Sequence, residues 1–213
     1  MFRFTSSEIR DLIIAFIVIS LCFAIVQGGR DVNAVLTILP IVMVGVGAGF
    51  ILHELGHKFV SMKYGYWAEF KLWPQGLIFA LITSFFGFVF AAPGAVYTYA
   101  NYMTDEINGK ISIAGPIVNI VLVLVFLAIG AAVYKSAFYS ETSLLIFIIC
   151  AAGYSINSFL AVFNLLPIGN LDGSKVLHWN FGIWIITIGF AAILTLSSMT
   201  IGFENMVRLI IGM

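Results

Sequence analysis

Three ionisable residues lie close together in the string HELGH: His53, Glu54 and His57. On a helix, residues four apart share one face, so both imidazoles can reach a single cation. Glu54 lies beside the first histidine, where it can serve as a general base toward a water molecule. Zn²⁺ takes histidine nitrogens as ligands and lowers the pKa of its water to about 7, so the string is typical of hydrolytic zinc chemistry.

The surroundings of this string favour a metal site over an accidental match. A five-residue H-E-x-x-H pattern arises by chance on exposed helices, but here it interrupts an apolar run that begins at residue 34. Ionisable side chains inside a membrane helix are costly and usually mark function. We therefore interpret His53 and His57, the one closely spaced histidine pair in the chain, as ligands of one Zn²⁺ per chain.

A third zinc ligand must come from elsewhere, because catalytic zinc normally takes three protein ligands. His178 is the remaining histidine, and its neighbour Trp179 makes it a better interfacial anchor than a ligand. Asp172 lies in the string FNLLPIGNLDG, where proline and glycine break the helix. A solvated turn is the alternative for Asp172, since Asp-Gly pairs are frequent turn formers. The string alone leaves both interpretations open.

Three strings in this order are similar to those of the site-2 protease family of intramembrane zinc metalloproteases. They are HELGH, GPIVN at residues 115–119, and a late N-x-x-P…D-G string, and the resemblance extends over about residues 34–175. It implies that zinc is held by His53, His57 and Asp172 and that Glu54 is the catalytic acid and base. It also implies that Asn164 assists near the oxyanion.

Two further positions bear on this resemblance. Asn119 matches the asparagine of the family G-x-x-x-N pattern in the intervening helix. The family often has proline immediately before Asp-Gly, whereas this chain has Leu171. A missing proline is expected to loosen the turn that aims the carboxylate of Asp172.

The composition identifies an integral membrane protein. Hydrophobic residues make up 62% of the 213 residues and charged residues 9%, against roughly 45–50% and 25% in soluble domains. Ten basic and ten acidic residues balance, so no net field attracts nucleic acid. The expected partners are the lipid bilayer and segments of membrane-protein substrates, and no feature sets an oligomeric state. Cys22 and Cys150 lie in apolar runs and are expected to be packing residues.

The expected fold is an all-α polytopic membrane protein with a single domain over residues 1–213. The first apolar stretch has no cleavage signature and is expected to be a retained span. A β-hairpin or re-entrant element is expected over residues 66–99, where 76–92 is just long enough for a sixth span and 87–99 favours strands and a turn. Five spans of suitable length are predicted at residues 12–27, 34–63, 111–134, 144–167 and 179–201.

The ligand set of the proposed zinc site decides whether residues 76–92 cross the membrane. Asp172 can join the histidines only if an even number of crossings separates them, and the spans 111–134 and 144–167 already provide two. The segment 76–92 is therefore expected to dip into the bilayer and return. An exposed strand edge can hold an extended peptide, so we expect residues 85–98 to line the substrate groove.

The basic residues indicate an orientation. Five spans leave seven on the side of the N-terminus and three on the other, and the positive-inside rule makes the first side cytoplasmic. A six-span count gives the same split. The active site is thus expected toward the cytoplasmic side of a multi-pass protein of the cell membrane. The seven are Arg3, Arg10, Lys58, Lys63, Lys71, Lys110 and Lys175, and the three are Arg30, Lys135 and Arg208.

The predicted function is a zinc-dependent metalloendopeptidase that cleaves transmembrane or juxtamembrane segments, as in regulated intramembrane proteolysis. One alternative is a divalent-metal transporter, although such proteins usually contain internal repeats and this sequence shows none. The other is a scaffold that binds membrane helices without cleaving them. An intact H-E-x-x-H string argues against it, because a scaffold would not need Glu54.

Overall fold

Polar residues mark where the long helices begin. The computed structural model describes residues 3–90 and 92–213. Five of the helices are preceded by a residue whose side-chain oxygen accepts a hydrogen bond from a backbone N–H of the first helical turn. Such a cap satisfies donors that the helix itself leaves unpaired. The capping residues are Thr5, Asp31, Thr104, Ser140 and Asn180.

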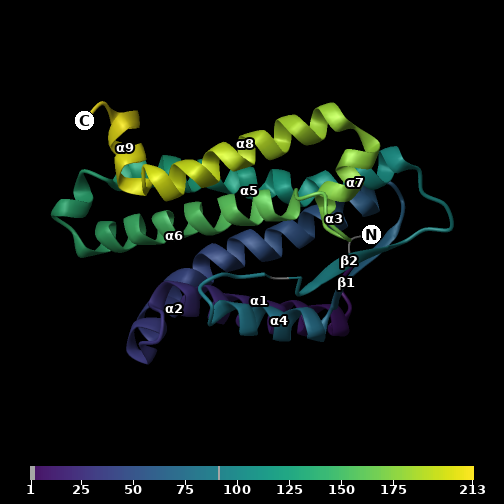
Figure 1. Ribbon diagram of the computed structural model, residues 1–213, viewed down its shortest axis with the longest axis horizontal. Coiled ribbons are helices and arrows are strands. Elements are labelled where there is room, and N and C mark those ends of the chain that lie inside the picture. The colour runs from purple at the N-terminus through teal and green to yellow at the C-terminus, as the bar shows by residue number, and fades with distance from the viewer. Residues whose placement is uncertain (1–2, 91) are drawn as a thin grey trace. The chain divides into compact units, whose positions relative to one another are not determined.

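The chain divides into two units, Met1–Tyr102 and Met103–Met213, and each is described by itself. Figure 1 labels their elements along the chain. The first unit contains α1 (Ser6–Gly28), α2 (Val32–Val46), a π-helical segment η1 (Gly47–Ile51), α3 (Leu52–Lys63), β1 (Trp67–Leu72), α4 (Pro74–Ser84) and β2 (Gly94–Tyr99). The second contains α5 (Asp105–Val133), a short 3₁₀ turn η2 (Ser136–Phe138), α6 (Glu141–Asn164), α7 (Asp172–Trp179), α8 (Phe181–Thr200) and α9 (Phe203–Ile211).

Five helical runs among the described residues are long and apolar enough to cross a membrane. They are Ser6–Gly28, Val32–Lys63, Asp105–Val133, Glu141–Asn164 and Phe181–Thr200. The predicted set of five spans is therefore confirmed by length and composition. The first helix starts earlier than the predicted residue 12, because the Thr5 side chain accepts the N–H of Glu8 and caps it. Glu8 and Asp11 consequently belong to α1 rather than to a flanking loop.

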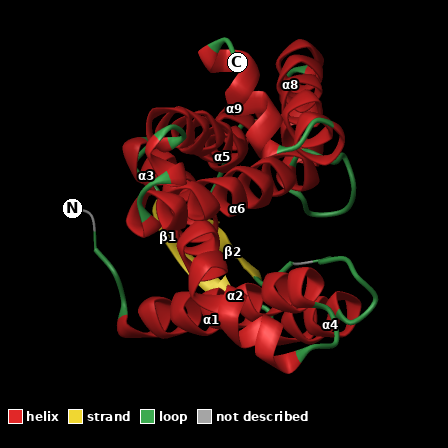
Figure 2. Cartoon of the chain, turned by 90° about the vertical axis from the view of Figure 1, so that its left-hand side faces the viewer, coloured by secondary structure: helices red, strands yellow, loops and turns green. Residues whose placement is uncertain are grey.

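In the first unit, α1 packs along α2, α4 and β1, and Figure 1 shows α1 and α4 side by side. Ala24 and Ile25 of α1 form a buried cluster with Val35 of α2. The two strands pair antiparallel in a register that runs from Trp67 opposite Tyr99 to Leu72 opposite Gly94. Figure 2 shows this small sheet in yellow among the helices.

The chain between the two strands leaves the sheet and returns to it. The backbone N–H of Trp73 donates to the carbonyl oxygen of Pro93 at 2.8 Å, which closes the excursion at its base. Residues 74–84 are helical, with Pro74 at the first position, where a missing N–H costs nothing. The strand character predicted for residues 87–99 is found at 94–99, while residues 88–90 and 92–93 have no regular structure.

The first turns of α1 close the outer edge of β1. Glu8 Oε1 accepts the backbone N–H of Phe70 at 3.1 Å, and Asp11 Oδ2 accepts that of Leu72 at 3.2 Å. These two N–H groups point away from β2, so carboxylates take the place that a third strand would occupy. The edge of β1 that faces α1 is therefore occupied.

In the second unit, α5 and α6 lie side by side over most of their length (Figure 1). Asn119 of α5 and Asn157 of α6 are completely buried, and the Asn119 amide donates to Asn157 Oδ1 at 3.0 Å. Asn157 in turn donates to the carbonyl of Gly153 at 2.8 Å. Buried amides must find partners, and this pair fixes how α5 and α6 face each other.

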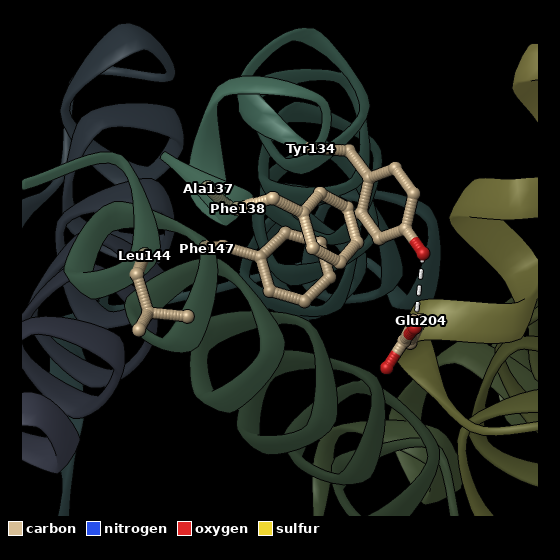
Figure 3. Close-up of a pocket in the computed structure, with 6 residues that line it drawn as sticks. All are labelled: Tyr134, Ala137, Phe138, Leu144, Phe147 and Glu204. Carbon is tan, nitrogen blue, oxygen red and sulfur yellow. Dashed lines mark hydrogen bonds between the residues drawn. The ribbon is translucent and has the colours of Figure 1, made fainter. Parts of the chain in front are cut away.

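The short helix α9 docks on the C-terminal end of α5. Tyr134 is buried, donates to Glu204 Oε1 at 2.9 Å and accepts from Arg208 Nε at 2.7 Å. A pocket of about 100 Å³ lies beside this contact and is mostly apolar. It contains none of the predicted site residues. Figure 3 shows its lining residues, which are Tyr134, Ala137, Phe138, Leu144, Phe147 and Glu204.

Candidate metal centre

The two histidines of HELGH face each other on α3, as the four-residue spacing predicts. Their Nε2 atoms lie 3.0 Å apart, and the ring planes are inclined by 80°. Both side chains are buried. Two nitrogens bound to a tetrahedral zinc ion at about 2.0–2.1 Å lie about 3.3 Å apart. The pair is thus arranged so that both Nε2 atoms can ligate one ion with little movement.

Glu54 is buried beside this pair, on the first turn of α3. A carboxylate at that place is removed from bulk water and lies within one helical turn of both imidazoles. Burial costs a charged group free energy unless a cation or hydrogen-bond donors compensate it. A divalent ion at the histidines is one such cation, so the site can hold Glu54 as a proton acceptor close to the metal.

A π-helical segment precedes the helix that carries HELGH, and no sequence pattern predicts it. Gly47–Ile51 has the wider i→i+5 hydrogen bonding, and α3 follows directly at Leu52. Short π segments inside α-helices are frequent at functional sites. The run Val32–Lys63 is therefore one helical run, long and apolar enough to cross a membrane, whose winding changes at Leu52, next to His53.

The sheet of the first unit lies against α3, the helix that carries HELGH. Ser61 Oγ of α3 is 2.8 Å from Thr98 Oγ1 of β2, and either hydroxyl can donate. Phe50 of η1 packs edge-on against Phe70 of β1, with ring centroids 5.7 Å apart. Contacts at both ends of the histidine turn thus hold the helix to the two strands.

Asp172 is the first residue of α7 in the second unit. A carboxylate at this position is stabilised by the positive end of the helix dipole. Its Oδ1 lies 3.7 Å from Lys175 Nζ, and its side chain is 12% exposed. Leu171, immediately before it, has φ −61° and ψ 156°, which is within the range that a proline ring imposes on φ. The leucine therefore has a φ that proline would also adopt, and the loosening expected from the missing proline stays a prediction.

Gly173 explains why glycine follows the aspartate. A Cβ added to Gly173 would lie 2.0 Å from the carbonyl oxygen of Leu165. Gly173 is helical, so its role here is to allow close approach of α7 to the end of α6 rather than to form a turn. The alternative interpretation of Asp172 as part of a solvated Asp-Gly turn does not describe this segment.

The remaining predicted residues lie in the second unit. Asn164 is the last residue of α6, and its amide donates to the carbonyl of Leu160 at 2.9 Å. His178 is exposed near the other end of α7, as expected for an interfacial residue. Asn119 serves the buried amide pair with Asn157. The structure thus groups His53, Glu54 and His57 on one helix and places Asp172 and Asn164 on two neighbouring helices of the other unit.

The curated proteins to which this chain is similar share one description, "Putative zinc metalloprotease". The protein named "Putative zinc metalloprotease MJ0611" of Methanocaldococcus jannaschii is 44% identical over 186 residues, which covers 87% of this chain and 91% of the relative. The chain belongs to this family of zinc metalloproteases. Rip2 of Mycolicibacterium smegmatis carries the same description and is 32% identical over 169 residues, 67% of this chain and 61% of its own length.

YwhC of Bacillus subtilis, described in the same words, is 27% identical over 156 residues and is covered to 70%. No protein-family model matches the chain. No solved structure matches it either.

The donor set on α3 fits the metal that this family name implies. Two buried imidazoles with facing nitrogens supply half of a tetrahedral zinc site. Hard cations such as Mg²⁺ and Ca²⁺ prefer a set made of oxygen ligands alone, which two imidazole nitrogens do not provide. The nitrogen-rich site therefore favours zinc over those cations.

Proposed function

We propose that this zinc metalloprotease is an intramembrane endopeptidase of the site-2 protease type, which cleaves transmembrane or juxtamembrane segments of membrane proteins. The observation that carries the proposal is the buried pair of His53 and His57, with Nε2 atoms 3.0 Å apart, in a helix apolar enough to cross a membrane. A soluble protease would place the same string on a helix that water can reach. In this proposal the hydrolytic group lies in a helical run that is long and apolar enough for lipid to surround it.

In this proposal one zinc ion per chain is held by His53, His57 and Asp172. Each of the three side chains offers one ligand atom to a metal ion. Asp172 is proposed because its carboxylate is fixed at the start of α7 by the contact between Gly173 and Leu165. Two nitrogens and one carboxylate oxygen form a His₂-carboxylate set, which leaves a fourth position open for catalysis.

The reaction needs a proton acceptor and a donor to the leaving group. Zinc, when bound, supplies a polarised carbonyl and water of lowered pKa. Glu54 is proposed to take the proton of the attacking water and pass it to the leaving amine, because its carboxylate is buried next to the histidines. Asn164 is proposed to donate its second amide hydrogen to the developing oxyanion, since the first is used by Leu160.

The segment between the strands is proposed to re-enter the membrane. Its two ends meet in the hydrogen bond from Trp73 to Pro93, so it enters and leaves on one side. The outward residues Ile78, Phe79 and Ile82 of α4 are apolar and exposed. A lipid surrounding accounts for that exposure better than water does.

Residues 85–98 are proposed to line the substrate groove, with β2 as the strand that receives an extended peptide. In the described part of the chain the sheet has two strands, and α1 occupies the outer edge of β1. The second edge of the sheet is therefore that of β2, which also contacts the metal-binding helix through Thr98 and Ser61. A peptide added there would be held in the extended form that proteolysis requires.

The orientation proposed is that of the charge bias, with the metal site toward the cytoplasmic side of the cell membrane. The expected partners are single membrane-spanning substrate segments and the bilayer, without nucleic acid. Labelling of single cysteines introduced into the loop between α5 and α6 tests the orientation. Labelling by an impermeant reagent from the outside is expected, and labelling from the cytoplasmic side alone would reverse it.

The deciding experiment is cleavage of single-span test substrates by the purified protein in detergent. Parallel samples contain wild type, Glu54→Gln, a chelator, and the chelator followed by added zinc. Glu54→Gln is expected to bind zinc stoichiometrically but to cleave at least about 100-fold more slowly, because it lacks the general base. Zinc should restore what the chelator removes. Metal uptake into proteoliposomes without cleavage would point to a transporter, and binding of substrates without cleavage under any metal condition to a scaffold.

A further inference from the structure

A fully buried ion pair joins α1 to the metal-binding helix. Lys58 Nζ of α3 lies 2.5 Å from Glu8 Oε2 of α1, and each side chain is 1% exposed. Lys58 follows His57 directly in the sequence. Lys58 also lies above the rings of Phe4 and Trp67, at 4.4 Å and 5.7 Å from their centroids.

The same glutamate also holds the sheet. The second carboxylate oxygen of Glu8 accepts the backbone N–H of Phe70 in β1 at 3.1 Å. Glu8 therefore contacts both the metal-binding helix and the strand that packs beside it. Its two oxygens have one partner each, which is the condition under which a buried carboxylate can remain charged.

Stability alone is a poor reason for such a pair. Two charges taken out of water lose hydration, and a well-packed apolar pair of the same volume is often equally stable or more stable. A buried pair does fix the relative position of the two elements that it joins, because misaligned partners would leave an uncompensated charge. Here it fixes the rotation of α3 about its axis and the position of α3 along β1.

We propose that Glu8 is a positioning residue of the zinc site, acting through Lys58. The pair, fixed on the Phe70 N–H, sets the rotation of α3 so that His57 and His53 present their Nε2 atoms to the metal. This inference rests on the proposed zinc site but not on cleavage. Residues that orient metal ligands typically change metal affinity or activity by about 10–100-fold when they are lost.

The first turn of α1 offers a matched control. Asp11 accepts the N–H of Leu72 in β1 at 3.2 Å, so it holds the same strand edge from the same helix. The hydrogen bonds and ion pairs seen for its carboxylate go to Leu72 and Arg10, and none goes to α3. Asp11→Ala therefore loosens β1 without removing the charge partner of Lys58.

The test compares zinc affinity in the purified full-length chain, measured by competition with a chromophoric chelator. The single variant Glu8→Gln removes the carboxylate that compensates the buried charge of Lys58 and is expected to unfold at lower temperature. The double variant Glu8→Gln with Lys58→Met removes both charges and keeps an acceptor for Phe70, so it is expected to unfold near the wild-type temperature. If Glu8 positions the site, this stable double variant still binds zinc at least about 10-fold more weakly, whereas Asp11→Ala binds it with wild-type affinity.

Cleavage kinetics of a test substrate are a second measurement of the role of Glu8. The double variant is expected to lower kcat with little change in KM, because substrate contacts β2 and not the ion pair. Wild-type zinc affinity in the folded double variant would overturn the proposal and leave the pair a feature of folding alone. Equal losses of affinity in Asp11→Ala and the double variant would also overturn it. If wild type binds zinc but cleaves nothing, the proposed function fails, while the affinity comparison still decides the role of Glu8.

Discussion

Gly173 approaches the carbonyl oxygen of Leu165 so closely that an added Cβ would lie 2.0 Å from it. The contact joins the first turn of α7, which carries Asp172, to the last turn of α6, which ends at Asn164. Both neighbours are proposed site residues. The close packing of two backbones therefore fixes how the two side chains lie relative to each other.

Gly173→Ala is expected to displace the first turn of α7, because a backbone oxygen cannot move aside as a flexible side chain can. Destabilisation of about 1–3 kcal/mol is expected from the overpacking, and zinc affinity should fall about 10-fold or more through Asp172. Thermal unfolding and chelator competition measure the two effects. Gly189→Ala in α8 is the control, since a Cβ there meets nothing within 4 Å. Unchanged zinc binding in Gly173→Ala would remove the argument that this contact aims a ligand.

Gly76→Ala tests the closure of the segment between the strands. A Cβ at Gly76 would lie 2.0 Å from the carbonyl oxygen of Ala92, so the helix α4 and the returning chain would have to separate. The expected cost is about 1–3 kcal/mol. Substrate cleavage should fall more than zinc affinity, because the returning chain leads into β2 while the histidines lie on α3. A variant that cleaves normally but unfolds earlier would show that this closure serves the fold and not the groove.

The features that the sequence predicted correctly are local ones. Spans are recognised from apolar length, and the five predicted spans are confirmed. The facing of His53 and His57 follows from their four-residue spacing, because a helix places such residues on one face. The zinc metalloprotease family is confirmed by the relatives. The single domain, the third ligand and the role of Asn164 stay predictions.

The features that the sequence did not predict depend on contacts between distant segments. The charge bias assigns Lys58 to the cytoplasmic side, but it gives no sign that Lys58 is buried and paired with Glu8, fifty residues earlier. No periodicity links two such positions. The π-helical segment before His53 likewise reflects which backbone hydrogen bonds form, and its residues are ordinary helix formers and glycines. For residues 76–92 the sequence leaves a span and a re-entrant element open, and the structure has a short helix at 74–84 that packs on α1.

Two hydroxyls at the N-terminal end of α1, those of the cap residue Thr5 and of Ser7, give the stability of the first unit a pH dependence through Glu69. The hydrogen bond from Thr5 lowers the pKa of Glu69 below its ordinary value of 4.5, with a further contribution from Ser7. A lowered pKa means that the charged form is stabilised in the folded protein, so the contribution is complete above 4.5 and is lost as the pH falls through the lowered value. Because Glu69 is solvent-screened, the contribution is expected to be below about 1 kcal/mol.

Comparison with Glu69→Gln isolates this effect. The unfolding temperature of wild type should exceed that of the variant at neutral pH, and the gap should close as the pH is lowered well below 4.5. Ser7→Ala is the matched control, since it removes the weaker partner alone and should reduce the gap only in part. If the difference in unfolding temperature between wild type and Glu69→Gln is the same at every pH, the amide of the variant is a poorer hydrogen-bond partner for Thr5 and the charge of Glu69 plays no part.

Tyr134→Phe tests the docking of α9. The Tyr134 hydroxyl holds both Glu204 and Arg208, and its bond to Arg208 raises the pKa of that guanidinium. Phenylalanine keeps the ring, which packs against Phe138 and Phe147 with centroids 5.2 Å and 5.4 Å apart. The variant therefore removes the hydrogen bonds and leaves the apolar contacts. Since Glu204 and Arg208 are about half exposed, water can replace the lost partner, and the expected cost is about 1 kcal/mol.

Limited trypsin digestion at Arg208 measures this loss, because a helix that undocks more often presents its arginine more often. Cleavage should be faster in Tyr134→Phe by about 5-fold, the equilibrium change that corresponds to about 1 kcal/mol. Zinc affinity should stay at the wild-type value, since no predicted site residue takes part in this contact. An unchanged digestion rate would show that the buried face of α9, formed by Phe203, Met206 and Val207, holds the helix without the tyrosine.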